Sequence, residues 1–139
     1  MRQTQQTLTL ATHGAGLYEF TDDARNFLHE SGLRLGQMTL FCRHTSASLL
    51  IQENADPTVI EDLKTFFSQI APQDRGLYAH ETEGPDDMPA HIRAALTQTS
   101  LTVPFAEGEL ALGTWQGLYL FEHRRAAHKR EVIVHVLGE

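Results

Sequence analysis

Apolar and polar residues alternate in short runs along much of the chain, a pattern typical of β-strands that have one face in water. The segment 4–11 is rich in threonine and alternates near its end, so we expect an edge strand there. The runs that predict strands are 4–11, 38–42, 46–51, 100–105, 110–116, 118–122 and 131–137. Because short strands follow one another directly, we expect them to pair in antiparallel fashion.

Apolar residues at helical spacing predict three helices between these strands. The first begins at Thr21–Asp23, which offers acceptors for free backbone N–H groups, and stops at Gly32. The second begins at Asp56–Pro57, where the carboxylate caps the first turn and proline loses no hydrogen bond. The third begins at Asp87–Pro89 and carries His91 in its first turn.

Strands and helices do not alternate regularly, which disfavours a parallel βαβ arrangement. We therefore expect an α+β fold, with an antiparallel, sandwich-like sheet core and about three helices packed on it. The chain has 139 residues, of which 41% are hydrophobic, and this is enough for one core of ordinary size. We expect a single domain over residues 1–139.

The formal net charge of −7 argues against broad nucleic-acid binding, which needs a basic surface opposite the phosphates. Cys42 is the single cysteine and cannot form an internal disulfide. The N-terminal segment lacks the features of a secretory signal, and no apolar run approaches the roughly 20 residues of a membrane-spanning helix. These features predict a soluble, cytoplasmic protein without a nucleic-acid or membrane partner.

Three histidines, His44, His80 and His91, lie in a long polar loop or where a loop meets a predicted element. If they converge, the three imidazoles would form an open site for zinc or another divalent metal. The chain has no His-Glu-x-x-His or paired Cys-x-x-Cys motif, so ordinary hydrogen-bonded or exposed histidines are the alternative. The pair Asp86–Asp87 could hold hydrated magnesium, although the helix dipole also favours acids before a helix.

Carboxylates and hydroxyls near His44 are candidates for catalysis. Glu53 and Asp56 could handle protons, but a helix cap already explains Asp56. Ser46 and Ser48 share a strand face, where their hydroxyls could bind an anion or pair across the sheet. Neither serine lies in a Gly-x-Ser-x-Gly elbow, which makes a serine hydrolase improbable.

Arg43 and Arg93 are candidates for phosphate binding, since a guanidinium offers planar donors to oxyanions. The basic segment 124–130 could do the same, but a solvated hairpin turn is the simpler interpretation. Trp115 could place an aromatic ring at a pocket, or belong to the core or an interface. Cys42, beside Arg43, could gain thiolate character, but a buried strand residue explains it better.

Three long motifs occur in order: the run from Phe41 to Pro57, the run from Glu83 to Ile92, and the C-terminal pair Leu110–Gly117 and Glu122–Arg124. Together they resemble the YjbQ-like family, also named the secondary thiamine-phosphate synthase family, over nearly the whole chain. The resemblance implies an α+β subunit with an antiparallel sheet, assembled as a homotrimer, and a cleft that carries the histidine motifs. The site residues that it implies are His44, Ser46, Glu53, Asp56, His80 and His91. The family's name implies the joining of a pyrimidine diphosphate to a thiazole phosphate, which releases pyrophosphate.

Two functions follow as hypotheses. The first is an enzyme in which a divalent metal, zinc or magnesium, held mainly by the three histidines, polarises a phosphate or activates water. Glu53 or Asp56 would handle protons, while Arg43 or Arg93 would steady an anionic substrate. Further candidates are Ser46 for catalysis, and Ser48 and Trp115 for substrate binding. The second hypothesis is a trimeric protein that binds a small phosphorylated metabolite without turnover. We expect no nucleotide cofactor in either case.

Overall fold

The computed structural model describes residues 1–74 and 76–139. Eight strands and three helices lie within these ranges, and none of the helices there is long and apolar enough to cross a membrane. In chain order the elements are β1 (Arg2–His13), β2 (Gly16–Glu19), α1 (Thr21–Ser31), β3 (Leu35–Cys42), β4 (Ala47–Glu53), α2 (Pro57–Ile70), α3 (Asp87–Leu96), β5 (Ser100–Ala106), β6 (Glu109–Leu110), β7 (Gln116–Glu122) and β8 (Ala127–Gly138).

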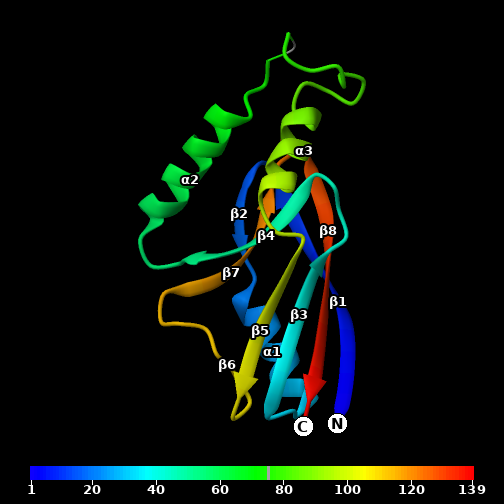
Figure 1. The fold of residues 1–139 in the computed structure, drawn as a ribbon, viewed down its shortest axis with the longest axis vertical. Helices are drawn as coiled ribbons and strands as arrows, with labels where there is room; N and C mark the ends of the chain where they lie inside the picture. The colour runs from blue at the N-terminus through cyan, green and yellow to red at the C-terminus, as the bar shows by residue number, and fades with distance from the viewer. Residues whose placement is uncertain (75) are drawn as a thin grey trace.

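The strands form two antiparallel sheets, as Figure 1 shows. The larger sheet has the order β1-β8-β3-β5-β6, and the smaller sheet has the order β2-β7-β4. The longest pairing joins β1 to β8, from Arg2 opposite Gly138 to His13 opposite Ala127. This architecture confirms the predicted α+β fold with an antiparallel core and three helices.

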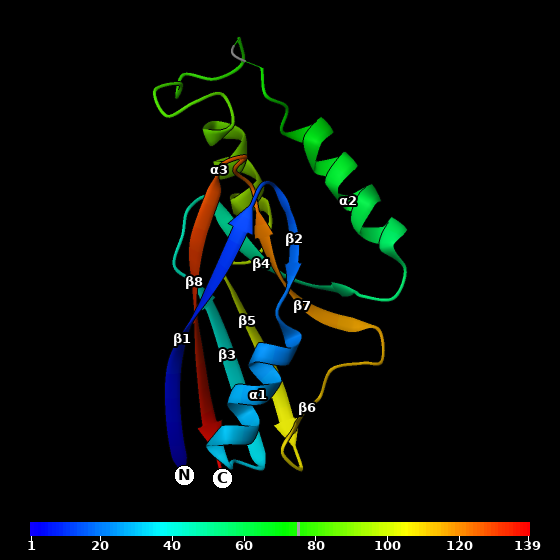
Figure 2. The same ribbon diagram turned by 180° about the vertical axis from the view of Figure 1, so that it is seen from behind.

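The core lies between the larger sheet and a second layer made of α1 and the smaller sheet. Met38 of β3 and Val134 of β8 belong to the same buried cluster as Leu28 of α1 and Leu120 of β7. In Figure 2, α1 lies over one part of the larger sheet. The smaller sheet lies beyond the N-terminal end of α1. Apolar and polar residues therefore alternate along the strands because every second side chain points into this core.

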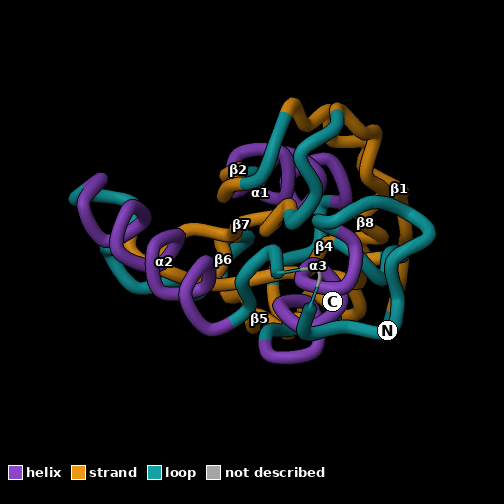
Figure 3. The backbone as a smooth tube through the Cα atoms, turned by 90° about the horizontal axis from the view of Figure 1, so that it is seen from above, coloured by secondary structure: helices purple, strands orange, loops and turns teal. Residues whose placement is uncertain are grey.

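Helix α2 stands outside these layers, to one side of the sheets in Figures 1 and 3. It begins as predicted, because Asp56 Oδ1 accepts a hydrogen bond from the Thr58 N–H at 2.9 Å and Pro57 opens the first turn. None of its side chains is buried, and Phe66 and Ile70 are 53% and 43% exposed. The described parts of the chain thus leave much of the apolar surface of α2 uncovered.

The predicted strand at 110–116 is wrong. β6 ends at Leu110 after two residues, and the chain leaves the sheet until β7 begins. A turn closes this excursion: Gln116 N–H donates to the Gly113 carbonyl at 3.1 Å, and Gly113 N–H donates to Gln116 Oε1 at 2.8 Å. The apolar residues of the segment imitate a strand, but these local bonds reverse the chain instead.

Two further segments differ from the prediction. The basic segment 124–130 is a turn only at its start, since β8 already begins at Ala127. The sequence pattern did not predict strand β2, because a run of four residues is too short to show a period. Its partner is β7, with Leu17 opposite Phe121, so tertiary pairing rather than local pattern defines this strand.

An ion pair between Glu122 and Arg130 is buried where the two sheets meet. Glu122 is fully buried and accepts from Arg130 Nε at 2.7 Å and from Thr12 Oγ1 at 2.6 Å. Arg130 also donates to the Ser46 side chain at 3.0 Å. Burial alone would raise the pKa of Glu122, but the hydrogen bonds from Arg130 and Thr12 hold it below its ordinary value. The pair connects β1, β7, β8 and the turn before β4.

Replacement of Glu122 by glutamine should lower the free energy of unfolding by about 3 kcal/mol, because it leaves the Arg130 charge buried without a counter-charge. Urea denaturation of the parent and of Glu122→Gln measures the difference. Glu109→Gln is the control, since Glu109 pairs with His29 at the surface and its loss should change stability by no more than about 1 kcal/mol. A loss below about 1 kcal/mol for Glu122→Gln would contradict the prediction.

Candidate functional site

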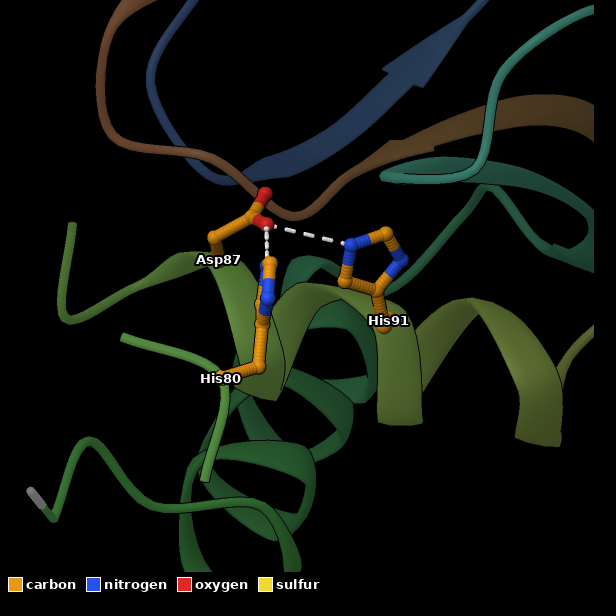
Figure 4. A group of neighbouring side chains, drawn as sticks. All are labelled: His80, Asp87 and His91. Atoms are coloured by element: carbon orange, nitrogen blue, oxygen red, sulfur yellow. Dashed lines mark hydrogen bonds and ion pairs between the residues drawn. The ribbon is translucent and has the colours of Figure 1, made fainter. Parts of the chain in front are cut away.

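His80, Asp87 and His91 form the densest cluster of potential metal ligands in the described part of the chain. His80 comes from the loop before α3, Asp87 is the first residue of α3, and His91 lies one turn later. Asp87 and His91 share a helix face because they are four residues apart. Asp87 Oδ2 is 2.6 Å from His80 Nε2 and 3.1 Å from His91 Nε2, and Figure 4 shows both rings directed at this oxygen.

The Asp87 carboxylate is held in place from its other side by Arg124. Arg124 donates to Asp87 Oδ1, to Asp86 Oδ2 at 3.1 Å and to the Glu83 carbonyl at 2.8 Å. Asp87 is only 2% exposed, and this burial alone would raise its pKa. The hydrogen bond from His80 and the charge of Arg124 outweigh burial and hold the pKa of Asp87 below its ordinary value. Asp87 is therefore an ionised, oriented acceptor.

A cleft of about 640 Å³ lies beside the cluster, and His91 forms part of its wall. Arg43 and His44, from the β3–β4 corner, are among the described residues that line it. None of these lining residues is acidic. The lining residues are Phe41, Cys42, Arg43, His44, Thr45, Ala47, His91, Ala94, Ala95 and Thr99. This composition suits a ligand with an apolar body and an anionic group. His80 faces a second, smaller cavity of about 180 Å³.

His44 lines this cleft but does not join the cluster of His80, Asp87 and His91. Its Nε2 accepts a hydrogen bond from the Glu131 backbone N–H at 2.7 Å. Burial, and next the charge of Arg130, lower the pKa of His44. The structure thus brings two of the three predicted histidine ligands together and adds Asp87 in place of the third.

The family model for UPF0047 proteins that are YjbQ-like matches residues 6–139. The chain therefore belongs to the YjbQ-like UPF0047 family. A UPF0047 protein of Synechocystis sp. is 56% identical over 138 residues, which cover 99% of this chain and 94% of that protein. The YjbQ protein of Escherichia coli O157:H7 is 43% identical over 136 residues, covering 97% of this chain and 98% of that one.

Solved structures agree with the fold of this YjbQ-like chain. An uncharacterised YjbQ/UPF0047 protein from Clostridium acetobutylicum matches with a TM-score of 0.84 and 33% identity, over 96% of this chain and 99% of that one. A conserved hypothetical protein from Thermus thermophilus matches with a TM-score of 0.85 and 33% identity, over 95% of this chain and 99% of that one. The resemblance seen in the sequence motifs is confirmed.

The other predicted residues of this YjbQ-like protein fall into two places. Ser46 contacts Arg130, and Ser48 is buried with its Oγ 2.9 Å from His123 Nε2. Arg93 donates to the carbonyl of Ala71 at 2.7 Å. Ser48 also accepts a hydrogen bond from Thr97, the residue that ends α3, while Arg93 lies on α3 itself.

Glu53 and Asp56 lie at the opposite end of α2 from the loop that carries His80, as the course of β4 and α2 in Figure 1 shows. Trp115 is close to them along the sheet, since its carbonyl accepts from Asn54 N–H at 2.9 Å, and its side chain is 61% exposed. The structure does not bring these three residues to the His80–Asp87–His91 cluster. It places Asp56 as the cap of α2, and the Thr58 hydrogen bonds lower its pKa.

Sequence reasoning considered Asp87 only as part of an Asp86–Asp87 magnesium pair and Arg124 only as part of a basic segment, and it missed their contacts in the histidine cluster. The signal for Asp87 was its spacing of four residues from His91, which puts both on one helix face. Arg124 gave no such signal, because its partners Asp86 and Asp87 are almost 40 residues away in the chain. Its place in a basic segment suggested a solvated turn instead.

His123 was also overlooked, although it is 1% exposed and directly precedes Arg124, which binds Asp87. Burial, followed by the charge of Arg93, lowers the pKa of His123 to about 3. Its Nε2 pairs with Ser48, while no described residue hydrogen-bonds its Nδ1. His123 is thus a buried, neutral imidazole that supports β4 against β7.

The stability of the protein should fall in acid partly through His123. Between about pH 6.5 and pH 3 the unfolded chain binds a proton at His123 that the folded chain does not, so the free energy of unfolding falls as pH falls, by up to about 1.4 kcal/mol per pH unit. His123→Gln, which keeps a partner for Ser48, should show a shallower fall between about pH 6 and pH 4 in urea titrations. His13→Gln, at an exposed position, controls for the loss of a histidine. Parallel curves for the parent and His123→Gln would refute this role.

Proposed function

We propose that this YjbQ-like protein is an enzyme that acts on a small phosphorylated metabolite, with thiamine-phosphate formation among its reactions. The observation that carries the proposal is the cluster of His80, Asp87 and His91, in which His91 also lines a cleft that has basic but no acidic described lining residues. A buried, oriented carboxylate shared by two partly exposed imidazoles, one of them in the wall of a cleft, is typical of functional sites.

The donor set favours a divalent metal as the cofactor. Two imidazole nitrogens and one carboxylate oxygen, all within 4.8 Å of one another, correspond to the two-histidine, one-carboxylate sites that leave coordination positions open. Imidazole nitrogen suits zinc or another transition metal, whereas magnesium prefers oxygen ligands and retained water. Of the two metals expected from the sequence, zinc therefore fits the cluster better. Arg124 would orient the Asp87 carboxylate toward the metal through its hydrogen bond, without binding the metal itself.

The chemistry fits the release of a phosphate-bearing leaving group. In thiamine-phosphate formation a new carbon–nitrogen bond joins the thiazole to the pyrimidine, the carbon–oxygen bond to pyrophosphate breaks, and its electron pair leaves with pyrophosphate. A bound metal would supply a positive charge that stabilises the departing oxygens. Arg43, which lines the cleft, would bind the phosphate oxygens, and His91 would define which end of the substrate faces the cluster.

A second candidate function is capture of a phosphorylated metabolite without turnover. One observation favours it: Asp87 already receives hydrogen bonds from both imidazoles and from Arg124, so the cluster is satisfied by protein groups alone. In that case the cluster would stiffen the cleft, and ligand binding would raise thermal stability without the appearance of product.

We further propose that the protein works as a homotrimer in a reducing, cytoplasmic compartment. Support for assembly comes from α2, an amphipathic helix whose apolar residues the described chain leaves partly uncovered. Contiguous exposed apolar residues on a helix are typical of surfaces that pack against another molecule, and a second and third copy would cover them.

Purified protein should contain about one zinc or related metal ion per chain, because the cluster offers one set of ligands. His80→Ala and His91→Ala should each lose it, and Arg124→Gln should weaken metal affinity about tenfold or more through loss of carboxylate orientation. Elemental mass spectrometry of tag-free protein gives the metal content, and His29→Ala is the control, since His29 lies outside the cluster.

Assays with the pyrimidine diphosphate and the thiazole phosphate separate the candidate functions. Product that disappears in the His80 and His91 variants supports the enzyme, while thermal stabilisation without product supports the binding protein. Metal content that is unchanged in both histidine variants would refute the metal centre.

Native mass spectrometry should find a species of about 47 kDa, the mass of three 15.6 kDa chains. Phe66→Asp should shift it to smaller species, because a carboxylate on the exposed apolar face of α2 would be desolvated in the assembly. Leu35→Asp is the matched control, since Leu35 is similarly exposed but lies on β3, away from α2. A Phe66→Asp protein that is folded and still trimeric would show that α2 is not the contact.

A further inference from the structure

The imidazole of His44 takes the place of a backbone carbonyl in the larger sheet. At the end of β3, Arg43 N–H donates to the Glu131 carbonyl at 3.2 Å, as in an ordinary antiparallel pair. The return bond of such a pair would run from Glu131 N–H to the Arg43 carbonyl. Instead, Glu131 N–H donates to His44 Nε2 at 2.7 Å. The ring is therefore fixed by the sheet itself, at the point where β3 ends and the chain turns toward β4.

This hydrogen bond determines which ring nitrogen carries the proton. A backbone N–H can only donate, so Nε2 must keep its lone pair. In a neutral imidazole the proton then resides on Nδ1. Protonation of Nε2 would direct two N–H groups at each other, and burial of the ring also disfavours the charged form. His44 is consequently a neutral hydrogen-bond donor through Nδ1.

The Nδ1–H group has no partner in the described part of the chain, and His44 lines the cleft together with Arg43, Thr45 and His91. We propose that the Nδ1–H group of His44 is a specificity-determining donor that binds a phosphoryl oxygen of the ligand in this cleft. The inference rests on the proposed function, because it takes the ligand to be a phosphorylated metabolite. It also gives His44 a role distinct from that of a metal ligand.

A fixed neutral donor would select for ligand geometry rather than for ligand charge. Arg43 supplies the positive charge that attracts an anion, but its side chain is half exposed and pairs with Glu131 at 3.6 Å. His44, held by one backbone bond, offers its proton in one direction only. A ligand with an acceptor oxygen at that place would bind, and one with a donor there would leave two N–H groups unpaired.

The tautomer can be measured directly, without any ligand. Long-range proton–nitrogen correlation spectra of ¹⁵N-labelled protein distinguish the two neutral tautomers and the charged ring, and the signal lost in His44→Gln assigns His44. At neutral pH we expect Nδ1 to be protonated and Nε2 to be unprotonated. A proton on Nε2, or a charged ring, would overturn the inference whatever the protein binds.

The role in recognition can be tested with pyrophosphate as the probe. His44→Gln can keep an acceptor for Glu131 N–H but loses the donor at the Nδ1 position, so the fold should persist while the Kd for pyrophosphate rises about tenfold. His44→Asn can place its amide N–H near the Nδ1 position and should recover part of the affinity. Isothermal titration gives the Kd values, melting curves confirm folding, and His29→Gln is the control for an unrelated histidine.

The outcomes separate the two proposals. If pyrophosphate perturbs the NMR signals of Arg43 and His91 while folded His44→Gln binds it as tightly as the parent, the role of His44 is wrong and the proposed cleft stands. If the parent does not bind pyrophosphate or perturb these signals at all, the proposed function fails, and the ligand role of His44 fails with it. A loss of about tenfold confined to His44→Gln supports both.

Discussion

Glu122 places a full negative charge in the interior at the end of β7, and Arg130 brings the matching positive charge from β8. The carboxylate also accepts hydrogen bonds from the backbone N–H groups of His123 and Arg124, at 3.0 and 3.2 Å. These bonds set the direction in which Arg124 leaves the strand toward Asp87. Arg130 meanwhile binds Ser46, in the turn that follows His44. One buried pair thus connects, through Arg124, to the Asp87 carboxylate of the cluster and, through Ser46, to the corner that lines the cleft.

Such a pair is unfavourable to bury, and its presence limits how the surrounding chain can vary. Each removed hydrogen bond would leave part of a charge without a partner in a region of low polarity. The same requirement constrains the residue at position 12 on β1, because the Thr12 hydroxyl is one of the few donors that reach the Glu122 carboxylate. The electrostatics of this junction therefore tie the largest strand pairing of the fold to the candidate site.

Local pattern was enough to predict most of the fold. Alternating residues revealed the strands because one face of each strand enters the core, and Asp56 with Pro57 revealed the start of α2 because caps act within a few residues. The same reasoning wrongly predicted a strand at 110–116, because the residues around Gly113 have an apolar pattern while local hydrogen bonds form a turn there. The sequence also suggested His80 and His91 correctly as neighbours. It could not reveal that Arg124 orients Asp87 or that Glu131 binds His44, because these partners are far apart in the chain and no periodicity connects them.

The anchored ring of His44 has a thermodynamic consequence for any molecule that contacts it. A side chain that is free to rotate loses conformational freedom when a ligand immobilises it, and this loss weakens binding. The bond from Glu131 removes that freedom during folding, before a ligand arrives. The entropy that the ring loses therefore lowers the stability of the folded sheet rather than the affinity for a ligand. A ligand that binds in the cleft contacts a side chain that is already ordered.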